Sequence, residues 1–345
     1  MKKTMEKINS NLLLIVLLVT ITLLASVGCN KSDASNKTNN SKETIAETVD
    51  NEKPSFIKSE NETQLVYLDP FGNEVTIKKN PERVVSLYAS FLDLWYYAGG
   101  EAVASVTSKS VAFPEGAENV EKLGSMSKVS PEKVLELQSD LVILSSTMKS
   151  HLELKDLLEE NNIPYLYLEY NNYEDYIEIL DLMSRIAGTE DELQAKVDSA
   201  DKDVQAIIKK SEGKDAPKVL IMFATSKSVS CELENGTTGD MVKKLGGENI
   251  VSDVAIKDAT RVDFSMERIL EQNPDIILVK TMGDIEACKT KMSEDIQSNE
   301  AWAGLNAIKD GKYYYLPKDL FMNKPNERFP EAFEMLYDYM YGEIK

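Results

Sequence analysis

The sequence predicts an α/β protein with two related α/β lobes, each built on a mostly parallel central sheet, joined by one long α-helix. Three observations predict this fold: a repeat with a constant offset, a long amphipathic helix between the two copies, and short buried strands without alternation. The chain that follows a polar N-terminal stretch is about 280 residues long, which exceeds what one hydrophobic core usually serves. Two lobes are therefore expected.

The internal repeat is found in two separated segments that share one offset. Residues 129–144, VSPEKVLELQSDLVIL, align without gaps to residues 264–279, FSMERILEQNPDIILV, which lie 135 positions later. The run RVVSL at 83–87 matches KVLIM at 218–222, again 135 positions later. Chance similarity between two helix-then-strand segments is the alternative. Because both pairs share one offset, duplication of a lobe is the simpler interpretation.

Residues 189–211 separate the copies and predict a helix roughly 33 Å long. Thr189 and Glu192 form a capping box at its start, and Gly213 and Pro217 mark its end. Its apolar residues make one narrow stripe, which is also typical of an ordinary amphipathic surface helix. Its position between the two copies favours instead a rigid link between the lobes. The expected boundaries are 65–188 for the N-terminal lobe, 189–211 for the linking helix and 212–345 for the C-terminal lobe.

Short β-rich runs alternate with helical segments along the N-terminal copy. A run without alternation, such as 83–87, is typical of a parallel sheet that is covered on both faces, and ligands bind such sheets where strands end. Residues 65–77 instead alternate around a turn, which predicts a small antiparallel hairpin. The other expected elements are strands 83–87, 102–106, 141–144 and 165–168, and helices 91–98, 131–138, 152–161 and 173–187.

The N-terminus has the pattern of a processing segment. Residues 1–28 combine a basic start with the short apolar run 12–25, and LASVGC ending at Cys29 resembles a bacterial lipoprotein box. This resemblance implies cleavage before Cys29 and its lipidation, including palmitate, although Ser26 departs from the usual leucine. Simple secretion and an uncleaved anchor are the alternatives. Residues 29–64 are polar and predict a lipid-anchored flexible tether, which places the protein outside the cytoplasm on the outer face of the cell membrane.

Composition excludes several classes of function. The net charge of −19 disfavours nucleic acid and anionic membrane surfaces, so membrane contact is expected through the lipid anchor only. Cys231 and Cys288 are too few for a disulfide framework, and two free thiols are favoured over one bridge. The single histidine, His151, disfavours a bare transition-metal site.

The sequence also shows no phosphate-cradling glycine loop and no nucleophile elbow, and it has one histidine to act as a base. We therefore expect no enzyme and no catalytic cofactor. A secreted two-domain α/β enzyme remains the alternative from another class, because two lobes alone do not exclude one. An adhesive or sensory lipoprotein is a third possibility.

Several motifs together resemble one family over residues 65–345. They are NPERVV at 80–85, SPE at 130–132 with LELQSDLVIL after it, GGENI at 246–250, PDIIL at 274–278 and PNER at 325–328. These are similar to the substrate-binding lipoproteins of bacterial ABC importers for iron complexes, haem and cobalamin, which are periplasmic binding proteins with a single rigid linking helix. The resemblance implies a monomer that binds its ligand between two lobes, moves little at the hinge, and serves an ABC permease dimer with a cytoplasmic ATPase.

The same family docks on its permease through one glutamate on each lobe. The resemblance assigns this role to Glu132 and Glu267, which the repeat makes equivalent. A carboxylate in the first turn of a helix is stabilised by the helix dipole and can accept from an arginine fork. The alternative is that both are ordinary residues of a helix start.

Candidate ligand-binding residues lie where buried strands are expected to end: Tyr88, Met126, Tyr170, Arg261 and Met282. Within the family, the sequence is most similar in appearance to Gram-positive haem-binding lipoproteins, which hold iron between a methionine and a histidine. Met126 corresponds to the methionine, one residue nearer Gly124, whereas Met282 stands at the histidine position. The resemblance therefore implies Met126 and Met282 as haem-iron ligands, and two thioethers would form a soft site.

Each of these assignments has an alternative. Methionines most often fill gaps in a core, Arg261 could form a surface salt bridge instead of pairing with an acidic ligand, and His151 could replace a methionine as a ligand. The expected function is the capture of an iron-containing ligand, haem first, and its delivery to the permease. A ferric siderophore or a cobalamin-type corrinoid is the alternative within the class.

Overall fold

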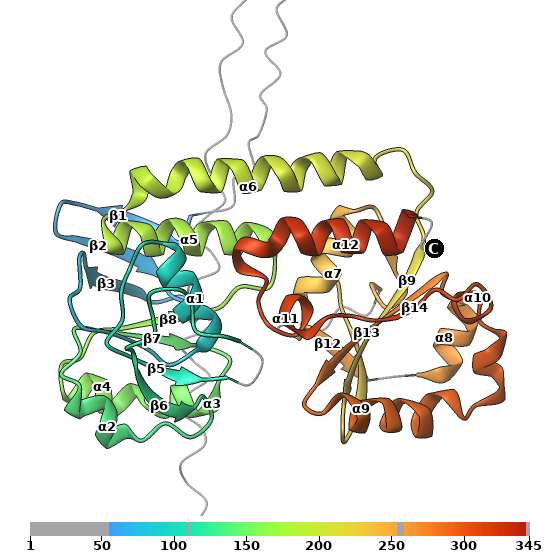
Figure 1. The fold of residues 1–345 in the computed structure, drawn as a ribbon, viewed down its shortest axis with the longest axis horizontal. Helices are drawn as coiled ribbons and strands as arrows, with labels where there is room; N and C mark the ends of the chain where they lie inside the picture. Colours follow the sequence, from blue (N-terminus) through green and yellow to red (C-terminus); the bar gives the residue numbers. More distant parts are fainter. Residues whose placement is uncertain (1–54, 109–110, 254–258, 264, 343–345) are drawn as a thin grey trace, which may run out of the picture. The chain divides into compact units, whose positions relative to one another are not determined.

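The computed structural model describes residues 55–108, 111–253, 259–263 and 265–342 (Figure 1). The expected signal peptide, Cys29 and the first part of the tether lie outside these residues. All the described residues belong to one compact unit. In the described part of the chain no helix is both long enough and apolar enough to cross a membrane.

The N-terminal lobe is built on a five-stranded sheet in the order β6-β5-β4-β7-β8, and every neighbouring pair is parallel. Central strands β4 and β7 are buried throughout, as expected from their lack of alternation. The helix expected at 152–161 is present but shorter, at Lys155–Glu160, and a separate short helix at Lys149–Leu152 precedes it. The strands are β4 (Val84–Ser86), β5 (Ala104–Thr107), β6 (Glu121–Ser125), β7 (Leu141–Ser145) and β8 (Tyr165–Leu168), and the helices are α1 (Ala89–Tyr97), α2 (Pro131–Glu136), α3 (Lys149–Leu152), α4 (Lys155–Glu160) and α5 (Tyr173–Ala187).

A separate antiparallel sheet precedes this lobe, with strands β1 (Ile57–Glu60), β2 (Gln64–Leu68) and β3 (Glu74–Lys78). The predicted hairpin is confirmed as β2 and β3. Asp69 fixes its turn, because one carboxylate oxygen accepts from the amide nitrogens of Phe71 and Asn73, at 2.9 and 2.7 Å. The flexible tether was expected to extend to residue 64, but its last part forms strand β1, which pairs with β2. Backbone hydrogen bonds hold this strand in the sheet, although it is polar and has few apolar side chains.

The C-terminal lobe has the sheet order β12-β10-β9-β13-β14, and β11 also pairs with β9. Strands β11, β13 and β14 run parallel to their neighbours, whereas β10 and β12 form antiparallel pairs at one edge. The sheet is therefore mostly parallel, as predicted. Its strands are β9 (Lys218–Thr225), β10 (Val229–Glu232), β11 (Glu248–Asn249), β12 (Arg261–Asp263), β13 (Ile276–Met282) and β14 (Tyr313–Tyr315), and its helices are α7 (Thr237–Lys244), α8 (Met266–Gln272), α9 (Ile285–Met292), α10 (Asn306–Lys309), α11 (Lys318–Phe321) and α12 (Phe329–Tyr341), with short turns at Ser293–Gln297, Glu300–Gly304 and Asn326–Arg328.

The repeat of the sequence reappears in the register of the two sheets. Val84 of β4 pairs with Leu141 of β7, and Val219 of β9 pairs with Ile276 of β13, so both partners are displaced by 135 positions. In both lobes, an aspartate side chain also fixes the backbone next to the strand by the same type of hydrogen bond. Asp140 accepts from the amide of Arg83 at 2.8 Å, and in the second lobe the carboxylate of Asp275 accepts from the amide of Lys218 at 2.9 Å. The two lobes thus share one framework.

The linking helix is confirmed as α6 (Glu190–Ser211), which starts after Thr189 as predicted. The capping box is wrong, because the Thr189 side chain makes no hydrogen bond to the first turn of the helix. Its hydroxyl instead donates to the carbonyl of Ala98 at the end of α1. Three acidic residues in the first turn complement the helix dipole in place of the box. Figure 1 shows α6 extending along α5 and α12, and both helices contact it.

A second connection joins the lobes at Asn326, which lies after the last strand of the C-terminal sheet. Asn326 is 1% exposed and has a φ of 51°, in the left-handed region. Its amide nitrogen donates to the Ser90 carbonyl at 2.9 Å and to the Asp93 carboxylate at 2.6 Å. Its amide oxygen accepts from the Tyr170 hydroxyl at 2.6 Å. All three partners belong to the N-terminal lobe, so the lobes are fastened by more than the linking helix.

Replacing Asn326 tests this connection. We expect Asn326→Gly to lower the free energy of unfolding by about 2 to 4 kcal/mol, because three buried hydrogen bonds are lost. Asn326→Ala should cost about 1 kcal/mol more, since alanine tolerates a positive φ less well than glycine. Chemical denaturation measures both values. A glycine variant within about 0.5 kcal/mol of the wild type would contradict the proposed connection.

Candidate functional site

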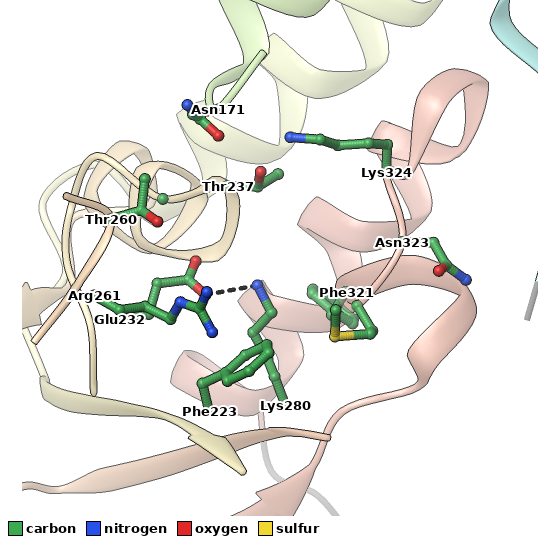
Figure 2. A pocket seen from close by; sticks show the side chains of 12 residues that line it. Asn171, Phe223, Glu232, Thr237, Thr260, Arg261, Lys280, Phe321, Asn323 and Lys324 are labelled. Atoms are coloured by element: carbon green, nitrogen blue, oxygen red, sulfur yellow. Dashed lines mark hydrogen bonds and ion pairs between the residues drawn. The ribbon is translucent and has the colours of Figure 1, made fainter. Parts of the chain in front are cut away.

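A charged pocket of about 130 Å³ lies on the C-terminal lobe, with one lining residue, Asn171, from the N-terminal lobe. Figure 2 shows its side chains, among them three cations and one carboxylate. Pockets that enclose a whole small-molecule ligand usually span about 300 to 1,000 Å³. The volume of this pocket is smaller, so it suits one acidic group of a ligand rather than a whole haem-sized macrocycle. The lining residues are Asn171, Phe223, Glu232, Gly236, Thr237, Thr260, Arg261, Lys280, Phe321, Met322, Asn323 and Lys324.

The parallel strands β9 and β13 position one wall of the pocket. Their register places Phe223 beside Lys280 and Thr225 beside Met282. Side chains two residues apart on a strand share a face, so Lys280 and Met282 point to the same side of the sheet. Met282 is the last residue of β13 and is 48% exposed. The pocket thus lies at the carboxyl end of the central strands, where α/β sheets bind ligands.

Glu232 and Lys280 form a buried ion pair within the pocket. The Lys280 Nζ atom is 2.6 Å from one Glu232 carboxylate oxygen, and the two residues are 8% and 3% exposed. The other oxygen accepts from the amides of Thr238 and Gly239, at 2.8 and 3.3 Å. The carboxylate therefore caps the first turn of α7 as well. A Cβ atom at Gly236 would lie 2.7 Å from the Glu232 side chain, which explains glycine there.

Arg261 and Lys324 supply the other two positive charges. Arg261 pairs with Glu232 in the β10–β12 register, and its guanidinium lies 4.1 Å from the centre of the Phe223 ring. Lys324 donates to the Tyr170 carbonyl, and its Nζ lies 4.3 Å from the centre of the Tyr170 ring. Burial, together with the smaller effect of the Lys280 charge, lowers the pKa of Lys324 to about 8. Both cations lie against aromatic rings, which stabilises them when water is removed.

These charges define what the pocket can bind. Three cations and one carboxylate line it, although the whole chain has a net charge of −19. A concentration of positive charge in a concave, partly buried place attracts anions and strengthens their binding. The arrangement therefore fits an acidic group of a ligand, such as a carboxylate. Among the described residues, no group of three or more His, Cys, Asp or Glu side chains is placed to hold a metal ion directly.

The structure distributes the expected ligand-binding residues over three places. Arg261 lines the pocket, and Met282 lies at the end of the strand that carries Lys280. Tyr170 is fully buried, and its hydroxyl donates to the Asn326 side chain. Its link to the pocket is indirect, because its carbonyl accepts a hydrogen bond from Lys324. Tyr88 and Met126 do not line this pocket.

Tyr88 and Met126 instead form a second group around His151 in the N-terminal lobe. The ring of His151 is fully buried and meets the Tyr88 ring edge-on, with 6.4 Å between ring centres. Its Nδ1 atom accepts from the Ser145 amide at 3.0 Å, so the neutral ring carries its proton on Nε2. Met126 is half-buried, and its carbonyl accepts from the Ser150 hydroxyl at 3.3 Å.

The repeat relates the two groups. Phe223 lies 135 positions after Tyr88, and Lys280 lies 135 positions after Ser145. The pocket and the His151 group therefore occupy equivalent places, at the carboxyl ends of the central strands of the two lobes.

Sequence reasoning missed Glu232, Lys280 and Lys324. A signal existed for Lys280, because a lysine inside the apolar run IILVKTM is costly to bury without a partner. Lys324 precedes the PNER motif and carries no such signal. Cys231 and Cys288 are free and buried, as favoured from the sequence. The Cys288 thiol donates to the Met282 carbonyl at 3.3 Å and so supports the end of β13.

These features define the class of the molecule as a two-lobed ligand-binding protein. The family model described as periplasmic binding protein matches residues 84–320, and this chain belongs to that family.

Two curated relatives are each 26% identical to the chain. One is the uncharacterized ABC transporter substrate-binding lipoprotein YvrC of Bacillus subtilis, aligned over 299 residues, which are 85% of this chain and 90% of YvrC. The other is the high-affinity heme uptake system protein IsdE of Staphylococcus aureus, aligned over 236 residues, which are 67% of this chain and 78% of IsdE.

Two solved structures share the fold. S. aureus IsdE complexed with heme has a TM-score of 0.66 and 24% identity, and the match covers 75% of this chain and 98% of that one. S. aureus SirA complexed with staphyloferrin B has a TM-score of 0.63 and 19% identity, with 81% of this chain and 99% of that one covered. At these identities the likeness concerns the fold alone.

The buried histidine makes stability depend on pH. Burial lowers the pKa of His151 from its ordinary value of 6.5 to about 4, and nearby backbone groups of Met126 and Leu87 oppose this shift. Between these two pH values the unfolded chain binds a proton that the folded chain does not. The free energy of unfolding should therefore fall by about 3 kcal/mol as pH drops from 6.5 to 4.

Denaturation of the wild type and His151→Asn over this pH range measures the effect. The variant should lose that part of the pH dependence, whatever its stability at pH 7. Parallel curves for the two proteins would contradict a neutral, buried His151.

Proposed function

We propose that this protein is the substrate-binding protein of an ABC importer and that it captures an iron-containing ligand, haem in the first place. It binds and releases this ligand as a monomer and does no chemistry on it. The family, and relatives that are substrate-binding proteins of ABC transporters, support the general role. The cationic pocket beside Met282 is the observation that supports an acidic, partly apolar ligand.

Haem has the features that this site would recognise. Its acidic propionates fit a pocket lined by Arg261, Lys280 and Lys324, and its apolar macrocycle fits the exposed apolar surface of Met282 and Ile285. The small volume of the pocket suits the acidic edge, with the macrocycle held outside it. Met282 remains a proposed iron ligand from the C-terminal lobe, and Met126 its proposed counterpart from the N-terminal lobe.

A ferric siderophore is the second candidate, and the same cations favour it. Siderophores that bind iron through carboxylates are also anionic, and SirA, which shares this fold, is complexed with staphyloferrin B. A corrinoid is less suited to the pocket, because its periphery carries amides rather than carboxylates.

The proposed place of action is the outer face of the cell membrane. Cys29 would carry the lipid, with residues 1–28 removed as a signal peptide and the chain that follows serving as the tether. YvrC, a relative over 85% of this chain, is described as a lipoprotein. The proposed partners are an ABC permease dimer and its cytoplasmic ATPase.

Glu132 and Glu267 are proposed to dock on this permease. Both are exposed in the first turn of equivalent helices, α2 and α8. Each helix is capped by a serine 135 positions from the other, since Ser130 accepts from the amide of Lys133 and Ser265 does the same for Arg268. The Ser130 hydroxyl also donates to the Glu132 carboxylate at 2.6 Å, which lowers the pKa of that group. Two exposed glutamates in equivalent positions suit two equivalent permease subunits.

Haem titration tests the ligand. Purified protein should give an intense, shifted Soret band, and Met282→Ala or Met126→Ala should shift or abolish it by removing a thioether from iron. Ile285→Ala is the matched control for ligation, because it removes an apolar side chain that is 39% exposed but no possible iron ligand, so it should weaken binding without shifting the band. If haem gives no band while a ferric siderophore binds tightly, haem is not the ligand. A band that survives both methionine changes would refute ligation by methionine.

Charge reversal tests the docking. Glu132→Lys and Glu267→Lys should each reduce ligand uptake by cells about tenfold or more, because each replaces an attraction by a repulsion, while binding to the purified protein stays unchanged. Glu136→Lys and Glu271→Lys are matched controls, because these exposed residues also belong to α2 and α8 and are equivalent in the repeat. Uptake that is equal for docking and control variants would refute the assignment.

A further inference from the structure

The Glu232–Lys280 pair determines how much charge the pocket offers to a ligand. Lys280 is held at 2.6 Å from a carboxylate that two backbone amides also fix in place. If Lys280 turned toward a ligand, Glu232 would remain buried without a cation, which is strongly unfavourable. Lys280 is therefore committed to Glu232, and its charge is cancelled within the pocket.

Arg261 and Lys324 are not cancelled in this way. Arg261 packs on an aromatic ring, and Lys324 donates to a backbone carbonyl. Within the described part of the chain, the only ion pair formed by a cation of this pocket is that of Lys280 with Glu232. The other lining residues are neutral, so Arg261 and Lys324 are the two cations of the pocket without a direct ion-pair partner, and the carboxylates of Glu169 and Asp175 act on Lys324 only from a greater distance.

We propose that Glu232 is a specificity-determining residue, which cancels Lys280 and so matches the pocket to a ligand with two carboxylates. This inference rests on the proposed function and refines it. A ligand with two propionates balances Arg261 and Lys324. A ligand with four carboxylates would bring excess negative charge next to Glu232, and a ligand with none would leave two desolvated cations unpaired. Glu232 acts through Lys280 and through charge repulsion, rather than by holding the ligand.

A series of iron porphyrins provides matched probes. Haem dimethyl ester, haem and iron coproporphyrin share a macrocycle and carry zero, two and four free carboxylates. Each can be titrated by its absorption spectrum at fixed, low salt. The wild type should bind haem most tightly, with the ester at least about tenfold weaker, because loss of paired charges costs at least that much.

Three variants change the charge count around the same macrocycle. Lys280→Met leaves Glu232 unpaired and should weaken haem binding about tenfold or more. Glu232→Gln frees Lys280 and should raise the affinity for iron coproporphyrin relative to haem about tenfold, since a third cation becomes available. The double variant Glu232→Gln with Lys280→Met returns the pocket to two cations. It should recover most of the haem affinity that Lys280→Met loses.

This rescue separates charge selection from a structural role. If the pair only supports the fold, the double variant should bind haem as weakly as Lys280→Met, and the proposal is refuted. Equal affinities of the wild type for haem and its dimethyl ester would also refute it, while haem remained the ligand. No absorption change with any of the three porphyrins would overturn haem itself. Circular dichroism and thermal unfolding confirm that each variant is folded.

Discussion

The arrangement of the whole molecule depends on burial of the apolar faces of three helices, α5, α6 and α12. Residues from all three belong to one hydrophobic core that also includes the central strands of both sheets. Because removing such surface from water is the main driving force of folding, the two lobes cannot separate without exposing it. The linking helix is therefore one part of a shared core. The buried Asn326, which is bonded to three groups of the N-terminal lobe, fixes the orientation that this core permits.

Those parts of the fold were predictable whose signal lies within one short segment of the sequence. Unbroken apolar runs indicated β4, β7, β9 and β13, and the offset of 135 positions recurs in their strand register. The edge strand β6 was missed because Leu123 is its only buried residue, which gives no pattern to detect. The capping box failed because a hydroxyl can find a better acceptor in another element, and the sequence does not show that Ala98 lies beside Thr189.

The candidate site was less predictable, because its charged residues are far apart in the sequence. Met282 was singled out from the end of an apolar run and does end β13, whereas Arg261, also expected at a strand end, begins β12. The charge of the pocket depends on Glu232, Lys280 and Lys324, which are 48 and 44 positions apart in turn. Only the folded sheet shows that Lys280 is cancelled and that Lys324 is not. Tyr170 illustrates the opposite case, since its position at a strand end suggested a ligand contact, whereas its burial gives it a supporting role.

The duplicated framework has one consequence for the direction in which a ligand can enter. At equivalent positions one lobe has Lys280 and Phe223, whereas the other has Ser145 and Tyr88. Duplication alone would make the two walls alike, so that a ligand could bind in either of two opposite poses. This likeness is broken by Arg261 and Lys324, which line the pocket of the C-terminal lobe and are not paired with a carboxylate as Lys280 is. Under the proposed function, an acidic edge would therefore face the C-terminal lobe, and the ligand would reach the importer with a defined end first.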